Sequence, residues 1–290
     1  MTLVCWRHFP HVVSYEHARR WLQFTANIGR ARNTIEAYGR ALDDHLRFCG
    51  SVGADPLKLR SDVIAAWIGE LHERPNSRAA NVLHLDSRVG LSNATIQQRI
   101  IAARSFYEYL VEDGLRERNP VRRGESGRRG RQPRKGLVRP IERAPWIPND
   151  LAWASILDAC RIEPLRNRLM VAMAYDGALR REELVQIEID DVEPAYSLIH
   201  LRAETTKGKR AREVAFGTAT GQLLVGYLRE RGRVFGRVNG RLFLSASRRN
   251  RGAPIGLWSW SKIVESIAGR AGLPRFSTHT FRHMRLTDLA

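Results

Sequence analysis

The chain of 290 residues is 43% hydrophobic, which is enough for one large or two ordinary folded domains and excludes a wholly disordered protein. No apolar run approaches the ~20 residues that a membrane-spanning helix needs, and the three scattered cysteines match neither a disulfide framework nor a zinc site. A formal net charge of +18, from 48 basic and 30 acidic residues, predicts a polyanionic partner, most commonly nucleic acid. The cysteine usage and the lack of a secretory signal in the first ten residues predict a cytoplasmic protein.

The first domain is predicted to be all-α. It covers residues 14–115, after an N-terminal extension of residues 1–13, and its apolar residues recur at helical spacing. Helices are expected to begin at Asn33 or Thr34, at Asp62, and at Ser92 or Asn93, where capping residues precede the apolar positions. Asp113 and Gly114 are expected to end the last of these helices.

A basic linker is predicted over residues 116–145. Residues 116–143 carry a net charge of +8, against +2 for residues 1–115 and +8 for residues 144–290, and the segment is rich in Gly, Pro and Arg. Self-repulsion should keep such a segment extended. Its candidate contacts to a phosphate backbone are Arg122, Arg123, Arg128, Arg129, Arg131, Arg134 and Lys135. The alternative is a solvated spacer that binds nothing.

The second domain, residues 146–290, is predicted to be mixed. Helices are expected after a cap at Asn149 or Asp150, at residues 165–175, from Arg180 to before residue 190, at 218–231, at 256–270 and from 279 onward. Residues 197–202 and 212–216 alternate as the two strands of a basic β-hairpin around a turn at 207–209, and residues 242–244 as a short strand. The predicted fold class is therefore mainly α, with a small antiparallel sheet in an α+β second domain.

Three segments of the second domain stand in an order that is more specific than any of them alone. They are YDGALRREELVQIEIDDV (175–192), TTKGKRAREV (205–214) and STHTFRH (277–283), and they follow a helical domain that contains RNTIEAYGRALDDHLRF (32–48). With this arrangement the chain resembles the tyrosine recombinases of the phage integrase type over nearly all of residues 14–290. The resemblance implies a SAM-like core-binding domain and a catalytic domain that together clamp double-stranded DNA at an inverted-repeat site. It further implies a homotetramer on two DNA duplexes, without a cofactor.

The resemblance also implies site residues. Arg180 matches the first catalytic arginine of the family and Lys207 matches the lysine of its β-hairpin. His279 and Arg282 match its H-x-x-R box, and Glu183 stands at the acidic position one helical turn after the first arginine.

The chemistry of phosphodiester transfer explains these residue types. Two guanidiniums, on Arg180 and Arg282, can hold the non-bridging oxygens of the transition state, a preorganised electrostatic stabilisation that needs no metal. An ammonium can protonate the departing 5′-oxygen; Lys207 is our first choice and Lys209 the second. His279 can take a proton from the nucleophile or bond the phosphate, and Glu183 is expected to orient Arg180 rather than to react.

One departure from the family concerns the nucleophile. The family continues past the H-x-x-R helix to a second His or Trp and then to a tyrosine that forms a covalent 3′-phosphotyrosyl intermediate. None of the seven tyrosines follows His279, and the sequence stops eleven residues after it, within a predicted helix. We therefore expect a C-terminally truncated sequence, and a chain that binds DNA without cleaving it.

Two other functions stay open, as do structural rather than functional roles for several residues. The chain is alternatively a decayed integrase that only binds DNA, or an enzyme like the type IB topoisomerases, which share this chemistry. Core packing is the simplest interpretation of Trp258 and Trp260. His283 is expected to be a packed or phosphate-adjacent neighbour of the box, and His200 a structural or surface residue. Arg248, Arg249 and Arg251 form a loop cluster that either contacts phosphate or is only solvated.

Overall fold

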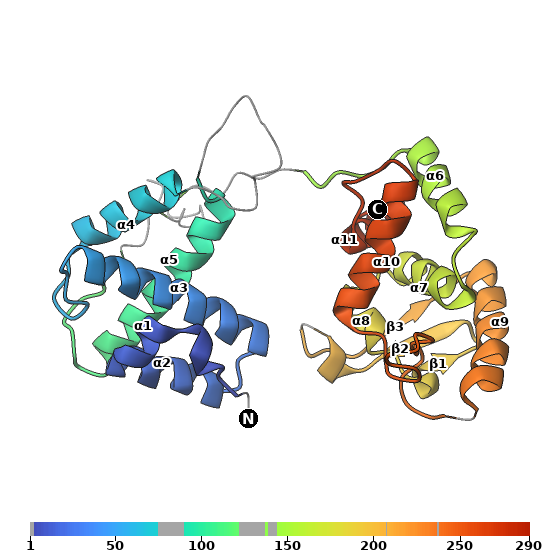
Figure 1. Ribbon diagram of the computed structural model, residues 1–290, viewed down its shortest axis with the longest axis horizontal. Helices are drawn as coiled ribbons and strands as arrows, with labels where there is room; N and C mark the ends of the chain where they lie inside the picture. The colour runs from blue at the N-terminus through green and yellow to red at the C-terminus, as the bar shows by residue number, and fades with distance from the viewer. Residues whose placement is uncertain (1–2, 75–89, 122–136, 139–143, 207, 237) are drawn as a thin grey trace. The chain divides into compact units, whose positions relative to one another are not determined.

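Two units, residues 1–143 and 144–290, make up the computed structural model, and each has its own hydrophobic core (Figure 1). The structure describes residues 3–74, 90–121, 137–138, 144–206, 208–236 and 238–290. The predicted DNA contacts of the linker, Arg122 to Lys135, and the predicted catalytic Lys207 lie outside the described residues.

The described part of the first unit is helical. Its helices are α1 (Pro10–Ser14), α2 (Glu16–Asn27), α3 (Arg32–Ser51), α4 (Ser61–Glu73) and α5 (Asn93–Glu112), after a 3₁₀ turn at Trp6–His8. The predicted cap of α5 is confirmed, because the Ser92 side chain accepts a hydrogen bond from the backbone N–H of Thr95. Helix α3 begins at Arg32, slightly before the predicted cap, and α1 and α2 were not predicted.

The core of the first unit lies mainly between α3 and α5, and it takes side chains from both ends of the unit. Phe9 and Val12, within the predicted N-terminal extension, are fully buried in it. The Phe9 ring lies so close to Gly39 of α3 that a Cβ there would come within 2.7 Å of it, so this contact requires glycine. Val121 and Val138, within the predicted linker, are buried in the same core. The packed unit therefore extends beyond residues 14–115 in both directions.

The second unit combines helices with a small sheet. Its elements are α6 (Asp150–Cys160), α7 (Leu165–Asp176), α8 (Arg181–Val185), β1 (Val192–Glu193), β2 (Leu198–Leu201), β3 (Arg212–Ala215), α9 (Thr218–Phe235), α10 (Leu257–Arg270) and α11 (Thr278–Asp288). Figure 1 shows α11 beside α7 and α10, and the ring of Phe281 on α11 stacks on Trp260 of α10. The Asn149 cap of α6 is confirmed by its hydrogen bond from the N–H of Ala152.

Among the described residues the sheet is antiparallel in the order β1-β2-β3. The predicted hairpin is β2 and β3, in which Leu201 pairs with Arg212, and Ile199 and Leu201, which share one face of β2, are buried. Strand β1 was not predicted. The mainly α fold class with a small antiparallel sheet is confirmed.

The predicted strand at residues 242–244 is wrong. The segment is buried, but it pairs through an isolated bridge between Leu244 and Pro254 rather than through a ladder. The N–H of Leu242 donates to the carbonyl of Ile187, and the N–H of Ile255 donates to that of Phe243. Backbone groups of loops that are distant in sequence therefore satisfy this segment without a sheet.

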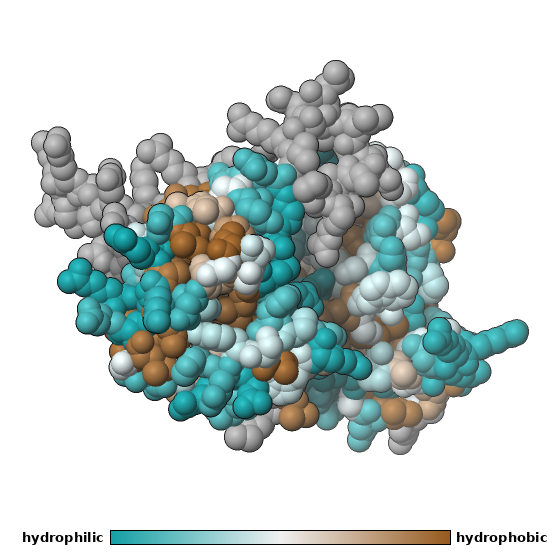
Figure 2. Space-filling model, turned by 60° about the vertical axis from the view of Figure 1, so that its left-hand side comes forward, coloured by the Kyte–Doolittle hydropathy of each residue, from teal (hydrophilic) through white to brown (hydrophobic). Residues whose placement is uncertain are grey.

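Some large apolar side chains remain at the surface. Figure 2 shows apolar residues scattered among hydrophilic ones on the visible face. Trp260 is buried as expected, whereas Trp258 on the same helix is 73% exposed and lies beside the Lys262 ammonium, so core packing is wrong for Trp258. In the described ranges, we find no helix with the length and apolar character needed to cross a membrane.

Candidate phosphate-binding site

The site begins where α7 ends and α8 starts. Arg180 is the N-cap residue of α8, and its backbone N–H and its Nη1 each donate to the Glu183 carboxylate at 2.8 Å. A Glu at the third position of a helix reaches back to the N-cap in this way, so local sequence spacing builds the contact. The Glu183 side chain is only 1% exposed. Arg180 and Glu183 therefore form the pair that the sequence predicted.

Arg212, at the start of β3, was not predicted as a member of this site. Its Nη1 and Nη2 donate to the two oxygens of the Glu183 carboxylate at 3.1 and 2.7 Å. Burial alone would raise the pKa of Glu183, but the hydrogen bonds from Arg212 and Arg180 outweigh it and hold this pKa below its ordinary value. No local sequence signal points to Arg212, because it stands 29 positions after Glu183 and the fold brings the two side chains together.

The second predicted arginine comes from α11. Arg282 is half-buried, and its Nη1 donates to the backbone carbonyl of Ala178, which stands two residues before Arg180. Burial lowers the pKa of Arg282, and the nearby positive charge of Arg180 lowers it further. The charge on Glu183 acts in the opposite direction, and that on Arg212 in the same one. Arg180, Glu183, Arg212 and Arg282 thus share one electrostatic environment.

The two histidines of α11 are exposed. Ser277 and Thr280 cap the helix, with the Ser277 N–H donating to the Thr280 hydroxyl at 3.0 Å. His279 and Arg282 are three residues apart, and helical geometry places them as neighbours on the helix surface. His279 and His283 are both open to solvent, so each is accessible to a ligand.

The turn of the hairpin contributes one described lysine. Lys209 is exposed, its backbone is in the left-handed region at φ 49°, and its N–H donates to the carbonyl of Thr206 at 3.1 Å. The Thr206 hydroxyl in turn accepts from the N–H of Arg210 at 3.0 Å. The turn is therefore organised by Thr206.

His200 lies on the exposed face of the sheet, away from the buried faces of Ile199 and Leu201. It contacts Glu193 at 3.1 Å and Glu213 at 3.2 Å, and the hydrogen bond to Glu193 together with the charge of Glu213 raises the pKa of His200. These contacts fit a surface residue. The three arginines of the loop cluster, Arg248, Arg249 and Arg251, are also exposed. Across the described residues, no three His, Cys, Asp or Glu side chains gather as a metal site.

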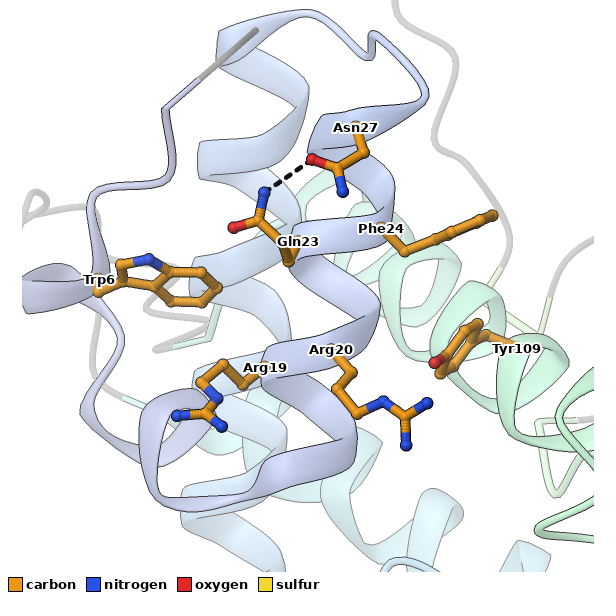
Figure 3. A pocket seen from close by; sticks show the side chains of 7 residues that line it. All are labelled: Trp6, Arg19, Arg20, Gln23, Phe24, Asn27 and Tyr109. Atoms are coloured by element: carbon orange, nitrogen blue, oxygen red, sulfur yellow. Dashed lines mark hydrogen bonds between the residues drawn. The ribbon is translucent and has the colours of Figure 1, made fainter.

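A surface hollow of about 450 Å³ in the first unit also combines arginines with aromatic rings (Figure 3). Its lining residues are Trp6, Arg19, Arg20, Gln23, Phe24, Asn27 and Tyr109. The ion pair of Arg20 with Asp113 is long, at 4.0 Å, and Arg19 and Arg20 are both exposed. These guanidiniums are not held in the way that Glu183 holds Arg180, so the hollow lacks the preorganisation that phosphate chemistry requires.

Comparisons with known proteins agree with this architecture. The model of the phage integrase family matches residues 152–290, and that of the phage integrase N-terminal SAM-like domain matches residues 19–114. The tyrosine recombinase XerD of Caulobacter vibrioides is 30% identical over 267 residues, which cover 89% of this chain and 77% of XerD.

Solved structures show the same fold. The XerH site-specific recombinase bound to palindromic difH substrate has a TM-score of 0.62 at 20% identity, covering 88% of this chain and 68% of that one. The Tn1549 transposon integrase in complex with circular intermediate DNA has a TM-score of 0.65 at 14% identity, covering 93% and 85%.

Proposed function

The chain belongs to the phage integrase family of tyrosine recombinases, and on this premise we propose that it acts in site-specific DNA recombination by breaking and rejoining DNA strands. One observation carries the proposal to the level of residues. Arg180 and Arg282 come from segments 102 positions apart in sequence, yet Arg282 donates to the carbonyl of Ala178, two residues before Arg180, whose own guanidinium contacts Glu183.

The proposed chemistry is an in-line transfer at a DNA phosphate. The hydroxyl oxygen of a tyrosine that these 290 residues do not supply forms a bond to phosphorus while the bond from phosphorus to the 5′-oxygen breaks, which leaves a covalent 3′-phosphotyrosyl intermediate. Arg180 and Arg282 hold the non-bridging oxygens, where the negative charge is concentrated. His279 takes the proton of the tyrosine or bonds the phosphate, and Lys207 gives a proton to the 5′-oxygen, with Lys209 as the alternative donor. Glu183 orients Arg180.

The residues given contain no tyrosine after Tyr227. Tyr227 is buried on α9, and its hydroxyl donates to the carbonyl of Leu242 at 3.1 Å, so it belongs to the core rather than to the site. We propose that a protein made of these 290 residues alone binds DNA without forming the covalent intermediate. A DNA-binding protein of this kind is the second candidate function.

The proposed partner is double-stranded DNA with an inverted-repeat site, in the cytoplasm, with a homotetramer as the acting assembly. The DNA named with XerH and with the Tn1549 integrase supports the choice of DNA. Arg122, Arg123, Arg128, Arg129, Arg131, Arg134 and Lys135 are proposed as contacts to the phosphate backbone, because the segment that carries them has a net charge of +8.

The experiment that tests this function selects binding sites from a random pool of duplex DNA. The expected result is an inverted-repeat sequence that the 290-residue chain binds with a steep dependence on salt, and no denaturant-resistant adduct on the same duplex carrying a nick. Binding without sequence preference would favour a topoisomerase-like enzyme, and a covalent adduct would contradict the non-cleaving role. Absence of DNA binding would overturn the proposal as a whole.

A further inference from the structure

The carboxylate of Glu183 is surrounded by hydrogen-bond donors rather than by water. The structure gives it four hydrogen bonds, two from Arg180 and two from the forked guanidinium of Arg212. A buried carboxylate is costly unless it is paired and hydrogen-bonded, and an arginine fork satisfies both oxygens at once. Arg212 therefore supplies two of the four bonds that keep Glu183 ionised and in place.

The charge count gives Arg212 a second effect. If Arg180 were the sole partner of Glu183, the two charges would cancel and the pair would attract a phosphate weakly. With Arg212 bound to the same carboxylate, the group of three carries a net charge of +1. Arg282 adds a further positive charge. It lies close enough to Arg180 and Arg212 for their charges to lower its pKa. The cluster thus keeps a surplus of positive charge although its carboxylate is fully buried.

We infer that Arg212 is a positioning residue, which holds Glu183 and through it keeps the Arg180 guanidinium oriented and available as a net cation for a bound phosphate. The inference rests on the proposed function, because it requires an anion at Arg180. Arg212 begins β3 and pairs with Leu201 of β2, so the antiparallel ladder fixes its backbone. Its hydrogen bond to Glu183 also connects β3, the return strand of the hairpin, to the start of α8.

The test measures how well inorganic pyrophosphate protects individual arginines of the full chain from phenylglyoxal. Peptide mass spectrometry gives the modification rate of Arg180 and of Arg282 at each pyrophosphate concentration, and hence a dissociation constant at each position. The variants are Arg212→Met, Glu183→Gln and the double variant. The matched control is Arg210→Met, because Arg210 is an exposed arginine on the same hairpin.

A role through Glu183 makes the effects of the two substitutions interdependent. Arg212→Met should raise the dissociation constant at Arg180 about tenfold, since it leaves Arg180 as the sole partner of the Glu183 carboxylate, which then cancels its charge. Arg210→Met should raise it less than about twofold, because solvent screens an exposed charge. In the Glu183→Gln background, Arg212→Met should change it less than about threefold, because the carboxylate through which Arg212 acts is already neutral.

Each other outcome contradicts a different statement. An equally large effect of Arg212→Met with and without Glu183→Gln would show that Arg212 acts on the anion independently of Glu183, and would overturn the positioning role. No effect of Arg212→Met on a protected Arg180 would overturn it as well. If neither pyrophosphate nor duplex DNA protects the wild-type arginines, the proposed function fails instead.

Arg212→Met removes two hydrogen-bond donors from the buried Glu183 carboxylate and could prevent folding. A second variant therefore tests the same inference. Arg212→Gln keeps a donor for Glu183 but lacks the charge. It is expected to fold and to weaken pyrophosphate at Arg180 by about three- to tenfold, while Arg212→Lys, which keeps the charge, should recover most of the loss. Wild-type affinity in Arg212→Gln would overturn the inference.

Discussion

Arg282 of α11 donates a hydrogen bond to the carbonyl oxygen of Ala178, 104 positions earlier in the chain, and Ala178 stands in the left-handed region at φ 45°. The same short turn, after Gly177 at the end of α7, leads directly to Arg180. The conformation of Ala178 therefore links the backbone that carries Arg180 to the side chain of Arg282. A residue with a Cβ pays for this conformation, because its side chain crowds the following carbonyl.

Replacing Ala178 by glycine tests this strain. Glycine adopts positive φ freely, which recovers about 1–2 kcal/mol, but it also gives the unfolded chain more freedom, which costs about 0.4–1 kcal/mol. The free energy of unfolding of Ala178→Gly should therefore equal that of the wild type or exceed it by up to about 1.6 kcal/mol. The control is Ala172→Gly within α7, which should lose about 1 kcal/mol in urea unfolding. Equal losses in both variants would show that Ala178 is unstrained.

The sequence predicted those features whose causes are local. The side chains of Ser92 and Asn149 each accept a hydrogen bond from the backbone N–H three residues downstream, and Glu183 reaches back three residues to Arg180. The alternation predicted for residues 197–202 places Ile199 and Leu201 on one face of the strand, as observed.

Features that depend on distant partners were missed. Nothing near Phe9 in the sequence indicates that its ring packs on Gly39, and nothing near residues 242–244 indicates that Ile187 binds their backbone. Arg212 and Glu183 are 29 positions apart, and only the pairing of β3 with β2 brings them together. Trp258 and Trp260 look alike in sequence, and the orientation of α10 decides which of them is buried.

Asp44 connects three helices of the first unit. Its carboxylate accepts from Arg74 at 2.6 Å, from Arg99 and from the indole N–H of Trp67 at 3.3 Å, and it is largely buried. Asp44→Asn removes the charge that these donors share, so we expect a loss of about 2 kcal/mol in the free energy of unfolding. Asp158→Asn, which affects an exposed pair with Arg161, should cause no measurable loss. Equal stability of Asp44→Asn and the wild type in urea would contradict the central role of Asp44.

The salt dependence of DNA binding reports how many phosphates the site contacts. The slope of log K against log salt concentration falls by about one for each phosphate contact that is lost. If Arg180 and Arg282 hold one phosphate, then Arg180→Gln, Arg282→Gln and the double variant should each reduce the slope by about one. Arg161→Gln, at an exposed arginine just after α6, serves as the control and should leave the slope unchanged. A reduction of about two in the double variant would place the two arginines on different phosphates.

His45 makes the stability of the first unit sensitive to acid. It is completely buried, its Nε2 lies 2.8 Å from the Tyr107 hydroxyl, and burial lowers the pKa of His45 to about 4 although the charge on Asp44 opposes the shift. The unfolded chain, with an ordinary histidine pKa near 6.5, binds the proton first, so stability is fully present above pH 6.5 and is lost as the pH falls towards 4. At about 1.4 kcal/mol per unit, the loss through His45 between pH 7 and pH 5 should be about 2 kcal/mol. His45→Gln keeps a polar partner for Tyr107 but does not titrate. Its free energy of unfolding in urea should therefore fall by about 2 kcal/mol less than that of the wild type between pH 7 and pH 5. The control His72→Gln, at an exposed histidine, should show the same fall as the wild type. The same acid sensitivity in His45→Gln and the wild type would assign the effect to another group.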